Sequence, residues 1–390
     1  MSTDFAGSLC YLDHAAATPL LPAVADAMQE AAGAFGNPSS MHAAGSQARR
    51  RLEEAREQIV ATLGGRTTGQ SRDRLLFTSG ATEANQMAVA GLMPLDRSKV
   101  PLFHSARDHA ATREAARGLA ADGRVVKELP LNADGALDTT AVAHAAANTP
   151  QAVVSTTLAC SQTGTLQNLA TISATFPQAI LHVDAVQAVG RVPLCFSQLP
   201  VASLALAAHK LGGPRGIGGL LLRDGVAIRP LLPGSQERGL RGGTESVALA
   251  VGFATAVELA VRHQAAETAR LAELRDRFEH ILRAAAAAKG LEVVVIGEGT
   301  VRVPHISVIA FPGFDRQATV MAADLAGICL ASGTACSSGS SEPSPALLAA
   351  GIPQSLVNSA VRISLGWTTT NNDLDRVLAF VRANLFCHPW

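Results

Sequence analysis

The sequence predicts an α/β protein whose main part is a mostly parallel sheet with helices on both faces. From residue 74 to residue 222, short apolar runs alternate with helical patterns, as expected when strands are joined by crossover helices. Hydrophobic residues make up 48% of the 390-residue chain and charged residues only 16%, so the chain can bury a large core. Beyond residue 290, further strands and helices predict a smaller α+β domain.

Charge and composition exclude several classes of protein. Lys plus Arg equals Asp plus Glu at 32 each, so no overall field attracts nucleic acid or an anionic membrane. Residues 1–10 lack the basic and apolar regions of a signal peptide, and no apolar stretch is long enough to span a bilayer, so we expect a cytoplasmic protein. The six cysteines are scattered without a Cys-x-x-Cys pair, so we expect neither a disulfide framework nor a metal site.

A short strand beginning at Tyr11 and two helices precede the main sheet. Apolar residues spaced three and four apart predict helices over residues 22–32 and 46–63. The polar loop over residues 36–45 separates them, because its Gly, Asn, Pro and Ser residues favour turns.

Polar side chains follow the ends of the predicted strands. Strands are predicted over residues 74–78, 101–104, 125–129 and 153–158, and further apolar runs end near residues 184 and 208. The polar residues just past strand ends are Thr82, His109, Ser161, Asp184, Gln187 and Lys210. Because ligands bind outside the carboxyl ends of strands in such sheets, these residues predict one site. Taken alone, His109 is more simply explained as a helix cap or a surface histidine.

One residue of this set, Lys210, ends an apolar run and precedes a glycine-rich turn. A lysine desolvated at the end of a buried strand can offer its amine for a Schiff base. Asp184 and Gln187 follow another strand, three residues apart. Pyridoxal phosphate (PLP) needs a lysine for its aldehyde, an acid for its ring nitrogen and donors for its phosphate, and the chain offers all three. The simpler alternative is a solvated turn lysine.

Residues 79–85 form a turn of small residues between a strand and a helix. Free N–H groups and the helix dipole at such a junction favour an anion, and Thr82 adds a hydroxyl. The alternative is an ordinary helix N-cap. A nucleotide site built on the glycines of residues 212–219 is a weaker rival, because those glycines precede a strand where the nucleotide motif opens a helix.

The chain beyond the main sheet is predicted to form the smaller domain. A helical pattern over residues 247–288 breaks near His263, where we place the domain boundary. The predicted large domain covers residues 16–262, and the small domain covers residues 1–15 and 263–390. Strands are expected over residues 291–296 and 305–311, and helices over residues 316–325 and 373–385.

Three segments of the second half carry polar or reactive side chains. Residues 231–245 are irregular and glycine-rich, and a segment of that length is usually functional or at an interface. Cys336 lies among small polar residues, about 330–345, which cannot pack as a core, so we expect an accessible, reactive thiol rather than a buried cysteine at a helix start. Arg362 on a predicted strand suits bidentate capture of a carboxylate, with a surface ion pair as the alternative.

Several motifs spread over nearly the whole chain occur together. They are Tyr11-Leu-Asp13, Gly36-Asn-Pro-Ser-Ser-x-His42, Thr78-Ser-Gly-Ala-Thr-Glu83, Asp108-His109, His182-Val-Asp-Ala-x-Gln187, His209-Lys-x-x-Gly-Pro-x-Gly216, Gln236-Glu-Arg-Gly-x-Arg-x-Gly-Thr244, Ser332-Gly-x-Ala-Cys336 and Arg362-x-Ser-Leu-Gly366. With them the chain resembles the cysteine desulfurases, in the class V aminotransferase group of PLP enzymes. The resemblance implies a fold-type I structure with a seven-stranded, mostly parallel sheet. The segment around Cys336 resembles that of the subgroup with a long mobile cysteine loop.

The resemblance implies a role for each residue around the cofactor ring. Lys210 would form the Schiff base with PLP, and Asp184 would keep the pyridine nitrogen protonated. Gln187 would bond the phenolic oxygen, and His109 would stack on the ring. Ser161 stands where an asparagine usually contacts cofactor and substrate.

The resemblance also assigns the phosphate and the substrate. Ala81, Thr82 and His209 would bind the cofactor phosphate, and Thr244 would reach the phosphate of the other subunit, which implies a homodimer. Arg362 would bind the carboxylate of L-cysteine. The implied reaction converts L-cysteine to L-alanine and leaves a persulfide on Cys336, from which a sulfur-acceptor protein in iron–sulfur cluster or thio-cofactor assembly takes the sulfur.

Three departures from the family pattern leave the cofactor chemistry intact and bear on the substrate and the efficiency. Cys160-Ser161-Gln162 replaces the usual Asn-Asn-Glu, Ala207 replaces a phosphate-binding serine, and the stretch Asp13-His14-Ala-Ala-Ala17 stands where the family often has two asparagines. The first of these motivates a rival, a PLP-dependent β-lyase acting on cystine or a related sulfur amino acid. A second rival is a catalytically weak copy kept as a scaffold that binds partners.

Overall fold

The computed structural model describes residues 9–93, 100–149, 151–333 and 342–386. Cys336, the predicted sulfur carrier, lies outside the described residues. None of the described helices is both long and apolar enough to cross a bilayer. Nowhere in the described ranges do three His, Cys, Asp or Glu side chains gather as a metal site would require.

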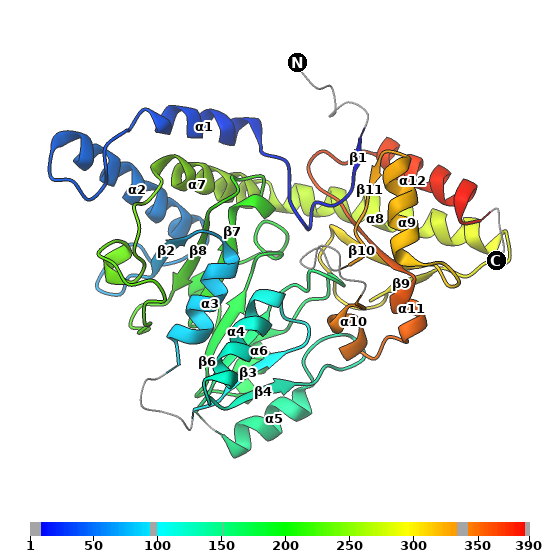
Figure 1. Cartoon of the computed structure of the whole chain (residues 1–390), viewed down its shortest axis with the longest axis horizontal. Helices are drawn as coiled ribbons and strands as arrows, with labels where there is room; N and C mark the ends of the chain where they lie inside the picture. The colour runs from blue at the N-terminus through cyan, green and yellow to red at the C-terminus, as the bar shows by residue number, and fades with distance from the viewer. Residues whose placement is uncertain (1–8, 94–99, 150, 334–341, 387–390) are drawn as a thin grey trace.

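A seven-stranded sheet forms the centre of the protein, in the order β2-β8-β7-β6-β5-β3-β4 (Figure 1). Its strands are β2 (Arg74–Thr78), β3 (Leu102–Ser105), β4 (Val126–Leu129), β5 (Val153–Thr157), β6 (Ile180–Asp184), β7 (Ser203–Ala207) and β8 (Gly218–Leu222). The pairs from β7 to β4 are parallel, and β8 is antiparallel to both of its neighbours. The connection between β7 and β8 is too short for a crossover helix, so β8 must turn back. The predicted mostly parallel, seven-stranded sheet is confirmed.

Helices cover both faces of this sheet, because alternate residues of each strand are buried on opposite sides. One face packs against α3 (Ala81–Gly91) and α4 (Ala110–Ala121). The other face packs against α1 (Pro22–Ala32), α2 (Ala43–Thr62), α5 (Thr139–Asn148), α6 (Leu169–Thr175) and α7 (Val247–Arg262). The helix α2 begins earlier than predicted, because Nδ1 of His42 accepts a hydrogen bond from the Gly45 amide at 3.2 Å and caps it.

A smaller unit of strands and helices follows α7. His263 separates α7 from α8 (Gln264–Ala287), as the predicted break requires. The three strands β9 (Val294–Ile296), β10 (Ile306–Ala310) and β12 (Ala360–Ser364) form an antiparallel sheet in the order β12-β10-β9. The remaining helices are α9 (Arg316–Leu325), α10 (Pro345–Ala349), α11 (Gln354–Asn358) and α12 (Asn371–Asn384).

The chain near the N-terminus pairs with this smaller unit. The strand β1 (Cys10–Tyr11) runs parallel to β11 (Ile328–Cys329), and Figure 1 shows it beside α12 and away from α1. The chain then crosses to the large sheet before α1 begins. The predicted domain limits, 1–15 with 263–390 against 16–262, agree with this course of the chain and stay a proposal.

Candidate active site

The predicted site residues lie at one edge of the large sheet, where its parallel strands end. Asp184 is the last residue of β6, and Lys210 closes a single 3-10 turn directly after β7. His109 caps α4 after β3, and Thr82 lies in the first turn of α3 after β2. Since β2 is parallel to β7 through the shared neighbour β8, all four positions face the same edge.

The chain segment between β1 and α1 holds the lysine. Nζ of Lys210 donates to the backbone oxygens of Ala15 and Ala16, both at 2.6 Å. The backbone oxygen of the neighbouring His209 accepts from the Thr18 amide at 2.9 Å. Burial, and after it the positive charges of Lys210 and Arg215, lowers the pKa of His209 to about 4, so its ring is neutral near pH 7 and can donate one N–H.

Asp184 is a buried carboxylate with two hydrogen-bond donors. The residue is only 4% exposed. Oδ1 accepts from the Val186 amide at 3.0 Å, and Oδ2 accepts from Nδ2 of Asn85 at 2.8 Å. Asn85 on α3 is a contact that the sequence analysis missed, because it lies 99 residues from Asp184.

Gln187 is held at both ends of its amide. Its Nε2 donates to the Ala15 oxygen at 2.8 Å, and its Oε1 accepts from Nε2 of His305 at 3.1 Å. Burial lowers the pKa of His305 well below its usual value, so this ring is neutral. The sequence analysis missed His305 as well, since a single histidine in the turn before a distant strand, β10, carries no recognisable signal.

His109 acts as a helix cap, as the simpler interpretation held. Its Nδ1 accepts from the Ala111 amide at 3.1 Å, which leaves the ring proton on Nε2. The preceding Asp108 accepts from the amides of Ser105 at 2.9 Å and Thr157 at 2.8 Å, and so joins the ends of β3 and β5. Burial raises the pKa of Asp108 to about 6. The expected stacking of His109 on a cofactor stays a prediction.

The turn before α3 offers an anion cradle. Among the described residues no side chain caps this helix, so its first amides, at Ala81 and Thr82, have no side-chain acceptor, and a Cβ built on Gly80 would meet no atom within 4 Å. On the other side, a Cβ on Gly218 would lie 2.6 Å from the Gly80 carbonyl carbon, so only glycine permits this approach. Glu83 fixes the turn, because its Oε2 accepts from the Ser79 amide at 2.6 Å.

Arg362 on β12 contacts the backbone of Ser161 and also has an ionic partner. Its Nη1 donates to the Ser161 backbone oxygen at 2.9 Å, and its Nη2 pairs with Oδ1 of Asp13 at 2.8 Å. Only 2% of Arg362 is exposed, so this is a buried pair rather than the surface pair considered as the alternative. A substrate carboxylate bound here would share the guanidinium with Asp13.

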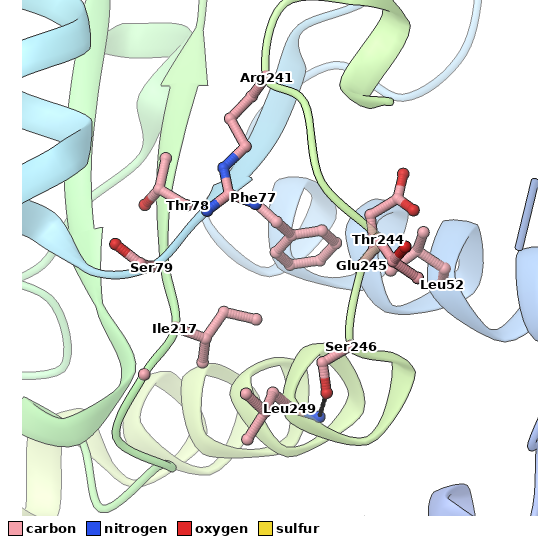
Figure 2. Close-up of a pocket in the computed structure, with 11 residues that line it drawn as sticks. Leu52, Phe77, Thr78, Ser79, Ile217, Arg241, Thr244, Glu245, Ser246 and Leu249 are labelled. Carbon is pink, nitrogen blue, oxygen red and sulfur yellow. Dashed lines mark hydrogen bonds between the residues drawn. The ribbon is translucent and has the colours of Figure 1, made fainter. Parts of the chain in front are cut away.

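The loop that carries Thr244 lies outside this group. Thr244 is exposed and lines a cavity of about 200 Å³ together with Thr78, Ser79 and Arg241. Figure 2 shows the Arg241 side chain pointing from the loop toward Thr78. Neither Lys210 nor Asp184 lines this cavity.

Two buried or partly buried ion pairs hold the same loop against the anion cradle. Arg241 donates to Glu83 at 2.8 Å, the residue that fixes the turn before α3. Glu237 pairs with Arg56 of α2 at 2.6 Å and accepts from the Phe77 amide of β2 at 3.0 Å. These contacts fix the segment over residues 231–245, and its functional or interfacial role stays a prediction.

The residues at this edge fit PLP by their chemistry. A lysine amine after β7, a buried carboxylate at the end of β6 and an uncapped helix start after β2 lie at the same edge of the sheet, matching the aldehyde, ring nitrogen and phosphate of the cofactor. Ala207, at the end of β7, offers no hydroxyl, so a phosphate bound here would depend on the turn before α3 and on the neutral ring of His209.

Comparison with known proteins places the chain in a family. The profile of the aminotransferase class-V family matches residues 10–377. An IscS-like cysteine desulfurase of Mycobacterium tuberculosis is 37% identical over 381 residues, which cover 95% of this chain and 94% of the relative. A cysteine desulfurase of Cereibacter sphaeroides is 38% identical over 375 residues, covering 94% and 93%. The X-ray structure of a NifS-like protein from Rickettsia africae superposes with a TM-score of 0.86 at 27% identity, covering 96% of this chain and 99% of that chain.

Fold and site together define a fold-type I enzyme that depends on PLP, and the chain belongs to the class-V aminotransferase family. Within that family it groups with the cysteine desulfurases, of which it covers 93–94% of the length in the two relatives named above.

Proposed function

We propose that this chain is a PLP-dependent cysteine desulfurase that converts L-cysteine to L-alanine and leaves the sulfur as a persulfide on Cys336. The transfer balances: the Cys336 thiol and L-cysteine give the persulfide and L-alanine, with no external oxidant. The observation that carries the proposal is the meeting of Lys210, Asp184 and Gln187 at neighbouring strand ends, in a chain 37–38% identical to cysteine desulfurases.

In this proposal the bound cofactor supplies an electron sink for the substrate Cα. Lys210 would anchor the cofactor, and its amine would move the Cα proton. Asp184 would hold a proton at the ring nitrogen, and Gln187 would donate to the phenolic oxygen. His109 would cover the ring, and Ala81, Thr82 and His209 would bind the phosphate.

Substrate binding depends on the smaller unit. Arg362 binds the carboxylate of L-cysteine through its guanidinium, beside the backbone of Ser161. Gln162 lies next to Gly333: a Cβ built on Gly333 would be 2.9 Å from Oε1 of Gln162. Gly333 is the last described residue before the segment with Cys336. Gly333 thus lies on the side of the proposed substrate site, which suits the proposal that the thiol of Cys336, three residues later, reaches the substrate sulfur and then an acceptor.

The active unit in this proposal is a homodimer. Thr244, exposed at the edge of the fixed loop, reaches the cofactor phosphate of the partner subunit. The sulfur acceptor is a protein that serves iron–sulfur cluster or thio-cofactor assembly. A cytoplasmic location suits this chemistry, because thiols there are kept reduced.

The test is an assay of purified protein with L-cysteine that measures alanine and pyruvate together, for the wild type and Cys336→Ala. Alanine from the wild type that is lost in the variant supports the proposal. Pyruvate formed equally by both proteins overturns it in favour of a β-lyase. Absence of both products from protein without bound cofactor favours the scaffold.

A further inference from the structure

A row of polar side chains crosses the large sheet beneath α3. Ser155 of β5, His182 of β6 and Ser203 of β7 are paired in register on neighbouring strands. All three are buried, at 1% exposed or less. The proposed roles use none of them, and a buried polar group needs a hydrogen-bonding reason to be there.

Asn85 links this row to Asp184. Nδ2 of Asn85 donates to Oδ2 of Asp184 at 2.8 Å, and Oδ1 of Asn85 lies 2.9 Å from Nε2 of His182. Nδ1 of His182 lies 2.8 Å from Oγ of Ser203. The side chains of Ser203, His182, Asn85 and Asp184 thus form one continuous row of hydrogen bonds that ends at the Asp184 carboxylate.

The Asp184 carboxylate at the end of this row determines the direction of every hydrogen bond in it. A carboxylate only accepts, so Asn85 must present its N–H to Asp184 and its oxygen to His182. His182 therefore carries its proton on Nε2. Burial lowers the pKa of His182 to about 3, so the ring is neutral, and its bare Nδ1 accepts from the Ser203 hydroxyl.

We propose that Asn85 and His182 are positioning residues that hold the Asp184 carboxylate in the orientation needed to bind the ring nitrogen of PLP. This inference rests on the proposed role of Asp184. The Val186 amide occupies Oδ1 and Asn85 occupies Oδ2, so the carboxylate cannot rotate freely. His182, itself fixed by Ser203, prevents the Asn85 amide from flipping, which would turn an oxygen toward Asp184.

The test measures the dissociation constant of PLP for the apoprotein, at pH 8 and pH 6, in variants of Asn85. Asn85→Leu removes the donor, and we expect binding about tenfold weaker or more at both pH values, since a hydrogen bond to a charged group is lost. Asn85→Asp places a second carboxylate beside Asp184. This variant should bind poorly at pH 8 and recover toward the wild-type value at pH 6, because the introduced carboxyl group donates again once it is protonated.

Two serines that flank His182 give a matched control. Ser203→Ala removes the hydroxyl that fixes the ring, and we expect PLP binding a few-fold weaker. Ser155→Ala removes an equally buried hydroxyl that has no hydrogen-bond partner among the described residues, and we expect PLP binding within twofold of the wild type. Equal losses of PLP affinity in Ser203→Ala and Ser155→Ala would contradict the proposed hydrogen-bond row from Ser203 to Asp184.

Nitrogen NMR of the wild-type apoprotein tests the direction without any substitution. A neutral His182 ring with its proton on Nε2 supports the proposal, and a proton on Nδ1 or a charged ring overturns it. Wild-type affinity in Asn85→Leu also overturns it. Asp184→Ala distinguishes failure of the proposed role of Asp184 from failure of the positioning role. If Asp184→Ala binds PLP as tightly as the wild type, the proposed role of Asp184 fails. If Asp184→Ala binds PLP more weakly but the Asn85 variants bind it as tightly as the wild type, only the positioning role fails.

Discussion

Lys210 and Gln187 donate to the same acceptor, the backbone oxygen of Ala15, at 2.6 and 2.8 Å. The two residues come from different strand ends, β7 and β6, and the segment between β1 and α1 joins them. The lysine proposed to anchor the cofactor and the amide proposed to bond its phenolic oxygen are thereby set at a fixed spacing before any cofactor binds.

Replacing Lys210 separates its chemical role from its structural one. Lys210→Ala should lose L-cysteine turnover by at least about 10²-fold, together with the visible absorption of the cofactor, because both the Schiff base and the proton-transferring amine are gone. Lys210→Arg keeps a charged donor for the Ala15 and Ala16 oxygens. We expect it to unfold at the wild-type temperature while remaining inactive; an active Lys210→Arg enzyme would remove Lys210 from the mechanism.

His305 should matter to the protein through Gln187. His305→Leu leaves Oε1 of Gln187 buried without its donor, which should cost about 1–3 kcal/mol of unfolding free energy in urea titrations. It should also weaken PLP binding several-fold, since the amide is free to flip. His305→Gln can restore the donor and should recover much of both losses. Equal cofactor affinity in all three proteins would show that Gln187 needs no such support.

The pair of Arg362 and Asp13 predicts opposite effects on substrate binding. Arg362→Lys loses the planar fork and should raise the KM for L-cysteine about tenfold or more. Asp13→Asn frees the guanidinium from its competing carboxylate, so KM should fall while the unfolding free energy decreases by about 1–3 kcal/mol. Steady-state kinetics and urea unfolding measure both. An unchanged KM in Arg362→Lys would place the substrate carboxylate elsewhere.

The contact between Glu83 and Arg241 should influence phosphate binding. Glu83→Gln weakens both the bond to the Ser79 amide and the ion pair, so the turn before α3 should hold PLP several-fold less tightly. Glu114→Gln on α4 is the matched control, because its pair with Arg117 is exposed and should contribute almost nothing. Fluorescence titration of the apoproteins with PLP gives both constants. A loss of affinity in Glu114→Gln as large as in Glu83→Gln would argue against the specific tether.

Buried histidines should make the fold sensitive to acid. Burial lowers the pKa of His14 and of His182 to about 3 each, whereas an unfolded histidine titrates near 6.5. The stability that these groups contribute is fully present above pH ~6.5 and is lost as the pH falls toward 3. Each should reduce the unfolding free energy by up to about 1.4 kcal/mol per pH unit in that window.

The histidine contribution is measured by urea unfolding at pH 7, 5.5 and 4.5. His14→Asn should flatten the pH dependence by about one proton, because its imidazole no longer takes up a proton on unfolding. His144→Asn, on α5 and away from both buried rings, should leave the slope as in the wild type. A slope unchanged in His14→Asn would mean that His14 already titrates in the folded protein.

The sequence predicted the parts of the fold that depend on local pattern. The helix over residues 22–32, the strand over residues 74–78 and the break at His263 follow from periodicity and agree with the structure. The order of strands in the sheet does not follow from periodicity, so neither the edge position of β2 nor the reversed direction of β8 was predicted.

The candidate site likewise contains some residues that the sequence could predict and others that it could not. Lys210, Asp184 and Gln187 follow strand ends, so their meeting could be expected from topology. Asn85 and His305 could not, because each meets its partner across about 100 residues through tertiary packing alone. Ala15 and Ala16 act through backbone oxygens, which every residue has, so no choice of side chain indicates them.

The pairing of β1 with β11 sets an order of events during synthesis. Residues 10–11 leave the ribosome more than 300 residues before their strand partners at 328–329. At about 5–20 residues per second, that delay is roughly 15–60 s. Throughout it, the segment that holds Lys210 has no anchor at its other end, so a nascent chain with a completed large sheet still lacks a finished lysine site. The lysine site is therefore completed only after the smaller unit has been made.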